Sequence, residues 1–235
     1  MSQDDPLRIL ERRARVGELG AGIGHEVRNV LTGVLGFAQV AGGRLDDPAE
    51  VGKCLGVIER ETARALEILE AFLAVGRLER HAATIDVNRL ATGAVDLVRH
   101  TFQLAQIDVG LELDPEAGLV TGDPGALRQV LLNLTLNASQ AMSGGGSVRV
   151  STRREAEAVV ILVADEGPGI PGELRDHIFT AFFTTRREGT GLGLSVSAAI
   201  VAEHGGALTL EPSARGATFA VRLPRRAPSG VERGR

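Results

Sequence analysis

The sequence predicts an α + α/β protein: a helical hairpin over residues 1–82, an α/β domain over residues 83–224 and a tail over residues 225–235. Three observations predict this division. Apolar residues recur at three- and four-residue steps up to about Arg80, as in amphipathic helices. From Thr84, short strand-like runs alternate with helical patterns. The last residues are rich in Arg, Pro, Ser and Gly, which is typical of disorder.

A first helix is predicted over residues 7–42. Because each residue advances a helix by about 100 degrees, its apolar residues fall in one stripe: Val16, Leu19, Ile23, Val27, Val30, Val34, Phe37, Ala38 and Ala41. His25 lies about 180 degrees from this stripe and is expected to face water. Glu26 is adjacent to it and Asn29 is one turn further, so the three form a polar group. Taken alone, an exposed His is an ordinary surface residue.

A second helix is predicted from Pro48 to about Arg80, after the helix-stopping pair Gly42 and Gly43. It repeats the single apolar stripe, with Val51, Leu55, Ile58, Thr62, Leu66, Leu69 and Leu73. Two helices with one stripe each cannot enclose a core, whereas two hairpins can form a dimeric four-helix bundle. The sequence therefore predicts a homodimer. Four glycines flank His25 and indicate either close helix packing or a hinge: Gly22, Gly24, Gly33 and Gly36.

The second part is predicted to alternate strands and helices. Strands are expected at Ile85 and Val87 and over 107–113, 119–121, 147–152, 158–164, 207–211 and 217–223; helices are expected over 88–100, over 125–142 and from the glycines at 189–193 to His204.

Composition excludes several classes of protein. The net charge is −4 and aromatic residues are 3%, without Trp or Tyr, so a nucleic-acid surface is not expected. Lys53 is the only lysine, so no lysine-containing phosphate loop can be written. The single Cys54, with neither a signal peptide nor a long apolar run, predicts a cytoplasmic protein without direct membrane insertion. Cys54 itself is expected in a helix core.

Polar residues in the second part suggest nucleotide chemistry. Asn133 and Asn137 are one turn apart on a helix, and the oxygen of Asn137 suits Mg²⁺, although such a pair also occurs on solvated faces and at caps. Asp165 ends an apolar strand, where it can accept from an exocyclic amine while Gly167 and Gly169 admit a flat base; the alternative is a simple turn.

A third glycine-rich stretch, with Gly189, Gly191 and Gly193, precedes a helix whose N–H groups can receive phosphates. It is not the dinucleotide fingerprint, because the preceding residues 184–188 are a polar loop and not a strand.

Five motifs in one order resemble the catalytic core of a bacterial sensor histidine kinase over about 220 residues. They are the H-box at 25–29, the N-box at 133–138, the first glycine box at 165–169, the F-box at 179–183 and the second glycine box at 189–194. The resemblance implies a dimerisation and phosphotransfer hairpin followed by a Bergerat-type α/β sandwich that binds ATP. The short lid, residues 184–188, resembles that of the nitrogen-regulatory kinases.

The same resemblance implies a role for each matching residue. His25 would be the phospho-acceptor, Glu26 the general base, and Asn29 would position a water for dephosphorylating a response regulator. In the second domain, Asn137 would hold Mg²⁺, and the remaining contacts to ATP would come from Asn133, Asp165, Gly167, Gly169, Arg187, Gly189, Gly191, Leu192, Gly193 and Thr218. Asp165 and Thr218 would lie near the adenine, and Arg187 near the phosphates. The implied partners are a response regulator and an unknown sensor domain or protein.

Two residues depart from the family pattern. Val30 stands where the H-box usually has Pro, and Arg186 stands where short-lid members often have Lys. Two rival functions remain: a phosphotransfer scaffold with a degenerate nucleotide domain, and an ATPase that uses water as the acceptor. A zinc protease is excluded because H-E-x-x-H is not met at residues 25–29.

Overall fold

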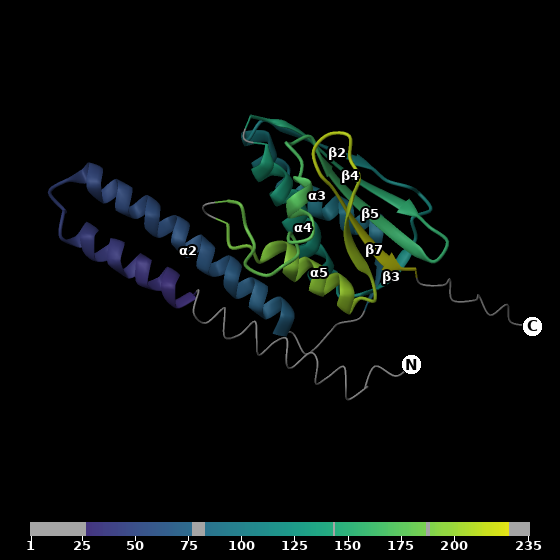
Figure 1. Cartoon of the computed structure of the whole chain (residues 1–235), viewed down its shortest axis with the longest axis horizontal. Coiled ribbons are helices and arrows are strands. Elements are labelled where there is room, and N and C mark those ends of the chain that lie inside the picture. The colour runs from purple at the N-terminus through teal and green to yellow at the C-terminus, as the bar shows by residue number, and fades with distance from the viewer. Residues whose placement is uncertain (1–26, 77–82, 143, 187–188, 226–235) are drawn as a thin grey trace, which may run out of the picture. The chain divides into compact units, whose positions relative to one another are not determined.

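A computed structural model describes residues 27–76, 83–142, 144–186 and 189–225 of the chain (Figure 1). It divides into two compact units, Met1–Leu78 with Phe182–Leu192, and Glu79–Ala181 with Gly193–Arg235. The predicted fold class is confirmed, since a helical hairpin precedes an α/β sandwich. The predicted boundary near residue 82 stays a prediction, because residues 77–82 lie outside the described part.

The hairpin consists of a helix over residues 27–42 and of α2, Pro48–Gly76. Asp47 sets the start of α2, since its Oδ1 accepts from the backbone N–H of Ala49 and of Glu50, each at 3.1 Å. Pro48 follows as the first helical residue, where its missing N–H costs nothing. The predicted turn between two helices is confirmed.

Apolar side chains of the hairpin divide between buried and exposed positions. Val30, Ala41 and Cys54 are buried, which confirms that the cysteine lies in a helix core. Four large apolar side chains of residues 27–42 are at least 40% exposed in the single chain: Leu31, Leu35, Phe37 and Val40. Leu55 of α2 is exposed to a similar extent. Among the described residues, a Cβ at Gly33 or Gly36 would meet no atom within 4 Å outside the backbone of its own helix, so close packing in this part of the chain does not explain these glycines.

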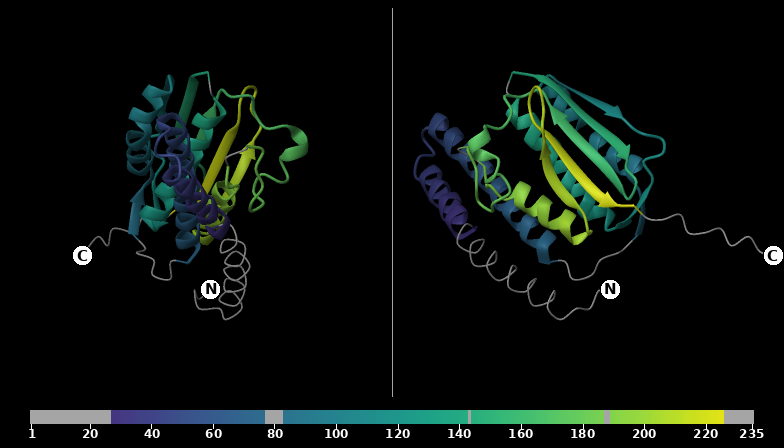
Figure 2. Two further views of the ribbon diagram at one scale, coloured as in Figure 1. Left: turned by 90° about the vertical axis from the view of Figure 1, so that its left-hand side faces the viewer. Right: turned by 45° about the vertical axis from the view of Figure 1, so that its right-hand side comes forward.

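The second unit is built on a five-stranded sheet of order β2-β4-β5-β7-β6 (Figure 2). Its strands are β2 (Ile107–Glu112), β4 (Gly146–Arg154), β5 (Ala158–Asp165), β6 (Ala207–Glu211) and β7 (Thr218–Pro224). β2 pairs with β4 in parallel and the other pairs are antiparallel. A separate pair joins β1 (Ala83–Asp86) to β3 (Leu119–Gly122).

Three helices pack on one face of this sheet: α3 (Val87–Leu104), α4 (Pro124–Ala141) and α5 (Gly193–Glu203), while a short 3-10 turn η1 spans Gly172–Leu174. The strand residues facing them are buried, for example Val150, Ile161 and Val221 at 1% exposure. Phe102 of α3 is fully buried in the same core. Alternate residues of each strand therefore close the core, as the period-two pattern requires.

The prediction that Val87 belongs to a strand is wrong. Val87 is the first residue of α3, because Asp86 caps that helix by accepting from Asn88 N–H at 2.9 Å and Arg89 N–H at 3.2 Å. The helix also continues beyond its predicted end at His100, to Leu104. Local capping thus outweighed the β propensity of a single valine.

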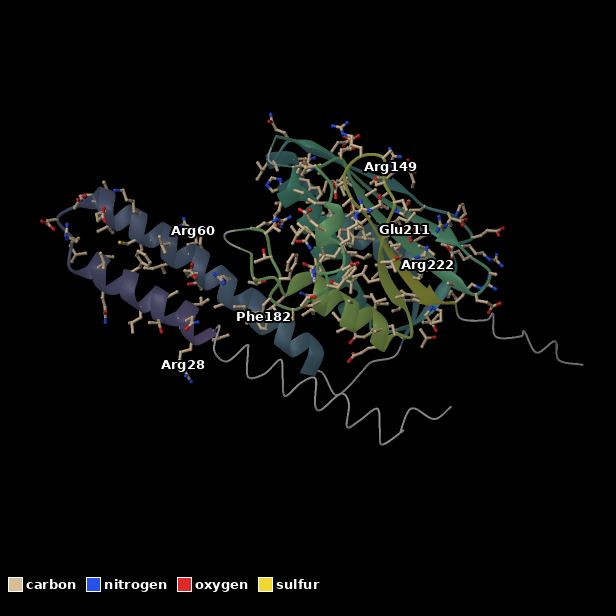
Figure 3. The ribbon with its side chains drawn as sticks, in the orientation of Figure 1. Arg28, Arg60, Arg149, Phe182, Glu211 and Arg222 are labelled. Atoms are coloured by element: carbon tan, nitrogen blue, oxygen red, sulfur yellow. The ribbon has the colours of Figure 1, made fainter. Side chains whose placement is uncertain are left out.

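The opposite face of the sheet carries charged side chains, including Arg149, Glu211 and Arg222 (Figure 3). Arg222 Nη1 lies 2.8 Å from Glu211 Oε1, and this hydrogen bond lowers the pKa of Glu211 below its ordinary value.

A helix with the length and hydropathy of a membrane span is not found in the part of the chain that the structure describes.

Candidate nucleotide site and phospho-acceptor helix

Asp165 ends β5 and is only 8% exposed. Its Oδ1 accepts from the backbone N–H of Gly167 at 2.9 Å and of Ala217 at 3.1 Å. The Asp165 N–H donates to the Ala217 carbonyl at 2.9 Å. Among the described residues, none donates to the second carboxylate oxygen. One oxygen is therefore fixed by the protein, and the other can accept from a ligand amine.

Glycines let three chain segments meet at this carboxylate. Gly216 has φ +69°, and a Cβ there would overlap the Asp165 carbonyl and lie 2.7 Å from Asp165 Oδ1. Gly169 has φ +77°, and its Cβ would come 2.9 Å from the Gly216 carbonyl oxygen. Only glycine adopts this left-handed backbone freely and also leaves the space. The first glycine box thus closes against the loop between β6 and β7.

The structure brings Ala217, and not Thr218, next to Asp165. Thr218 pairs with Ala164, one residue earlier on β5, and is half-buried. Because successive side chains of a strand point to opposite faces, the Thr218 side chain lies on the other face from that of Asp165. Sequence reasoning missed Ala217, because an alanine carries no polar group, and its contribution is its backbone N–H.

Helix α4 carries both candidate asparagines, and each is half-buried. Asn133 Nδ2 donates to Ser197 Oγ at 2.8 Å, and it lies beside Gly193, the first residue of α5. Two turns further along, a Cβ at Gly167 would lie 3.3 Å from Ala141 Cβ. Along α4, about 12 Å therefore separates Asn133, beside the start of α5, from Ala141, beside the Asp165 loop. Asn137 lies midway between them.

Asp123 holds α4 in this position. Its Oδ1 accepts from Gly125 N–H at 2.8 Å and Ala126 N–H at 3.2 Å, as in an N-cap. The Asp123 N–H donates to His204 Nε2 at 3.0 Å, and His204 Nδ1 lies 2.7 Å from the Ile200 carbonyl. The end of α5 is thereby fixed to the start of α4, so α5 is joined to α4 near both of its own ends, at Ser197 and at His204.

The stretch before α5 contains Gly189, Gly191 and Leu192. Gly191 has φ +67°, and its Cβ would come 2.7 Å from the Phe182 carbonyl oxygen. Phe182 itself has φ 65°, an uncommon value for a residue with a side chain. The loop between Phe182 and Gly191 is thus closed at its base. Arg187 lies outside the described residues.

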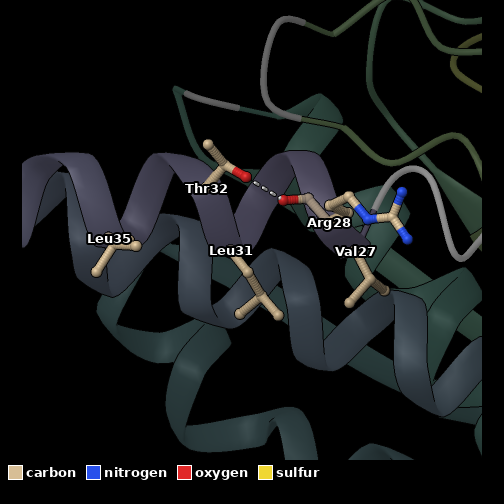
Figure 4. A pocket seen from close by; sticks show the side chains of 5 residues that line it. All are labelled: Val27, Arg28, Leu31, Thr32 and Leu35. Carbon is tan, nitrogen blue, oxygen red and sulfur yellow. Dashed lines mark hydrogen bonds between the residues drawn. The ribbon is translucent and has the colours of Figure 1, made fainter.

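His25 and Glu26 also lie outside the described residues, whereas Asn29 is exposed on the helix that follows them. A shallow groove of ≈ 370 Å³ lies on this helix, lined by Val27, Arg28, Leu31, Thr32 and Leu35 (Figure 4). The Thr32 hydroxyl donates to the Arg28 carbonyl at 2.7 Å (Figure 4). The helix therefore presents Asn29 and an apolar groove on its exposed surface.

Clusters of three or more His, Cys, Asp or Glu that suit a metal ion are absent among the described side chains. A neutral oxygen such as that of Asn137 is a ligand that Mg²⁺ accepts when it keeps several waters and binds phosphate oxygens. Such a cation does not need a full set of protein ligands. The oxygen ligands of this domain therefore fit a cation that binds together with a nucleotide.

Two family models match the chain. The His Kinase A (phospho-acceptor) domain matches residues 15–81, and the histidine kinase-, DNA gyrase B- and HSP90-like ATPase matches residues 122–227. A solved complex of histidine kinase ThkA with response regulator protein TrrA contains a chain that is 30% identical, with a TM-score of 0.77, covering 96% of this chain and 68% of that one. The chain belongs to the histidine kinases of two-component signalling, as their catalytic core.

Curated relatives include signal transduction histidine-protein kinase AtoS of Escherichia coli K12, 36% identical over 91% of this chain and 36% of that protein. Sensor histidine kinase ZraS of the same strain is 33% identical over 94% of this chain and 48% of that protein. The chain thus spans about half or less of the length of these relatives. The resemblance of the motifs to a sensor histidine kinase core is confirmed.

Proposed function

We propose that this chain autophosphorylates His25 from ATP and passes the phosphoryl group to an aspartate of a response regulator. The observation that carries the ATP site is the Asp165 carboxylate, with one oxygen held by two backbone N–H groups and the other open to an exocyclic amine. The family match of both domains supports the pairing of this site with an acceptor histidine. The chain would thus supply both the nucleotide site and its acceptor.

In the proposed site, Asp165 accepts from the adenine amine while Gly167 and Gly169 admit the base. Thr218 is proposed near the adenine from its motif position alone, although its side chain lies on the other face of the sheet from that of Asp165. The phosphates lie toward the start of α5, where the N-terminal backbone of a helix and its dipole favour anions. Their proposed contacts are Asn133, Arg187, Gly189, Gly191, Leu192 and Gly193. Mg²⁺, held by the Asn137 oxygen, would neutralise charge on the phosphates.

The proposed reaction moves the γ-phosphoryl group of ATP to His25. A neutral imidazole nitrogen of His25 forms a bond to the γ-phosphorus, the bond to the bridging oxygen breaks, and ADP leaves. Glu26 accepts the imidazole proton as general base. The phosphohistidine then donates its phosphoryl group to the regulator's aspartate, and Asn29 positions a water when the regulator is dephosphorylated. ThkA was solved in complex with response regulator protein TrrA, which supports a receiver domain as the partner.

A homodimer is the second part of the proposal. The exposed apolar side chains of the hairpin, Leu31, Leu35, Phe37, Val40 and Leu55, support a second copy that covers them. The short lid, residues 184–188, supports a place near the nitrogen-regulatory kinases. The use of ATP and the buried free thiol of Cys54 support a cytoplasmic location for this part of the protein. The signal would come from an unknown sensor domain or protein.

Radiolabel transfer from γ-labelled ATP tests the acceptor. We expect acid-labile, base-stable phosphate on the wild-type protein, none on His25→Gln, and wild-type levels on the matched surface variant His100→Gln. Wild-type labelling of His25→Gln would refute the assignment. Hydrolysis of ATP without protein labelling would favour the ATPase alternative.

Nucleotide affinity tests the base site separately. Asp165→Asn places an amide donor opposite the adenine amine, so we expect a loss of roughly 10- to 150-fold in ATP affinity by calorimetry. The exposed Asp108→Asn is the matched control and should bind normally. If the wild-type chain binds no ATP with Mg²⁺, the scaffold with a degenerate nucleotide domain becomes the better description.

A further inference from the structure

Ser197 of α5 is a polar side chain in an apolar setting. Ser197 is 2% exposed, and its neighbours on the helix, Val196 and Ile200, are 8% and 2% exposed. Only three other polar or charged side chains are buried among the described residues: Thr135, Thr152 and Asp165. A buried hydroxyl that lacks a hydrogen-bond partner costs free energy. The residue that bonds to the Ser197 hydroxyl therefore indicates the role of this side chain.

The partner of Ser197 is Asn133 of the N-box. Asn133 Nδ2 lies 2.8 Å from Ser197 Oγ, across the interface between α4 and α5. An amide nitrogen carries two hydrogens, so this bond uses one and leaves the other, together with Oδ1, for a ligand. This bond ties the Nδ2 end of the Asn133 amide to α5.

Gly193 constrains the same amide from one turn earlier on α5. A Cβ at Gly193 would lie 2.9 Å from Asn133 Nδ2 and would overlap Oδ1, so the amide rests directly on the glycine backbone. Contact with the Gly193 backbone and the hydrogen bond to Ser197 Oγ thus restrict a terminal torsion that is otherwise broad.

We propose that Ser197 is a positioning residue for nucleotide binding, which holds the Asn133 amide in the orientation that contacts the phosphates. The inference rests on the proposed function, because it needs Asn133 at the phosphate end of the site. An amide already held in its bound orientation loses less conformational entropy when the nucleotide arrives. Ser197 therefore raises phosphate affinity without touching the nucleotide.

The test is a double-mutant cycle on the full chain, with Ser197→Ala, Asn133→Ala and the double variant. Binding of a non-hydrolysable ATP analogue with Mg²⁺ is measured by calorimetry. We expect Ser197→Ala to weaken binding about 3- to 10-fold in the wild-type background and not to weaken it further in the Asn133→Ala background. Ala is a better helix former than Ser, so α5 is retained.

Thr135→Val is the matched control. It removes another buried hydroxyl, which donates only to the Leu131 and Leu132 carbonyls of its own helix, each at 2.9 Å. We expect it to change thermal stability but to leave the affinity within about twofold of wild type. A purely structural role for Ser197 would make the two variants behave alike.

Three results would overturn the inference. Wild-type affinity of Ser197→Ala would do so, as would an equal loss in both backgrounds, which would mean that Ser197 acts without Asn133. Normal binding by Asn133→Ala would remove Asn133 from the phosphates while leaving ATP binding intact. If the wild-type chain itself fails to bind the analogue, the proposed function fails and the inference fails with it.

Discussion

Gly216→Ala is the sharpest test of how the base site is built. The substitution forces alanine into a backbone with φ +69°, which costs about 1–2 kcal/mol. Its Cβ would also overlap the Asp165 carbonyl, so the two hydrogen bonds that join Asp165 to Ala217 must lengthen. Each contributes about 0.5–1.5 kcal/mol. We therefore expect the free energy of unfolding to fall by about 2–5 kcal/mol.

The assay is urea unfolding followed by far-ultraviolet circular dichroism, since the chain has no Trp or Tyr for fluorescence. Gly110→Ala on β2 is the matched control: a Cβ there meets nothing within 4 Å, and alanine should be neutral or stabilise by about 0.5–1 kcal/mol. If Gly216→Ala lies within about 0.5 kcal/mol of this control, Gly216 is not holding the loop against Asp165. We also expect the variant to lose measurable affinity for ATP.

Three further predictions concern stability. His204→Ala removes the acceptor for the Asp123 N–H, so the free energy of unfolding in urea should fall by about 1–3 kcal/mol. A fall of less than about 0.5 kcal/mol would contradict a fixed link between α4 and α5. Phe102→Ala empties a fully buried site and should cost about 3–5 kcal/mol in the same assay, whereas a surface-like value would contradict its place in the core. The hydrogen bond from Arg222 lowers the pKa of Glu211 in the folded protein. This pair therefore stabilises the fold at pH values above the ordinary pKa of 4.5, and the stabilisation is lost as the pH falls through the lower pKa of the folded state. Unfolding midpoints compared at about pH 5 and pH 3 should therefore fall further for wild type than for Glu211→Gln, and equal falls would count against this hydrogen bond.

Much of the fold was predictable because it depends on local spacing. The period of apolar residues predicted the hairpin and α4, and Asp123 with Pro124 predicted where α4 begins. The sequence places Val87 in a strand because two alternating apolar residues cannot be told from the first turn of a helix. The Asp86 cap decided between them, and its hydrogen bonds are seen only in the folded backbone.

The sequence alone determined the order of the motifs and the types of side chain, and these were enough to indicate a histidine kinase core and to single out Asp165 and Asn137. Tertiary structure alone decided which groups meet. Ala217 reaches Asp165 across 52 residues, and Ser197 reaches Asn133 across 64. The reason is physical: spacing along the chain reports one helix or strand at a time, whereas the pairing of β5 with β7 and the packing of α4 on α5 place backbone and hydroxyl groups whose residue types carry no signal of their own.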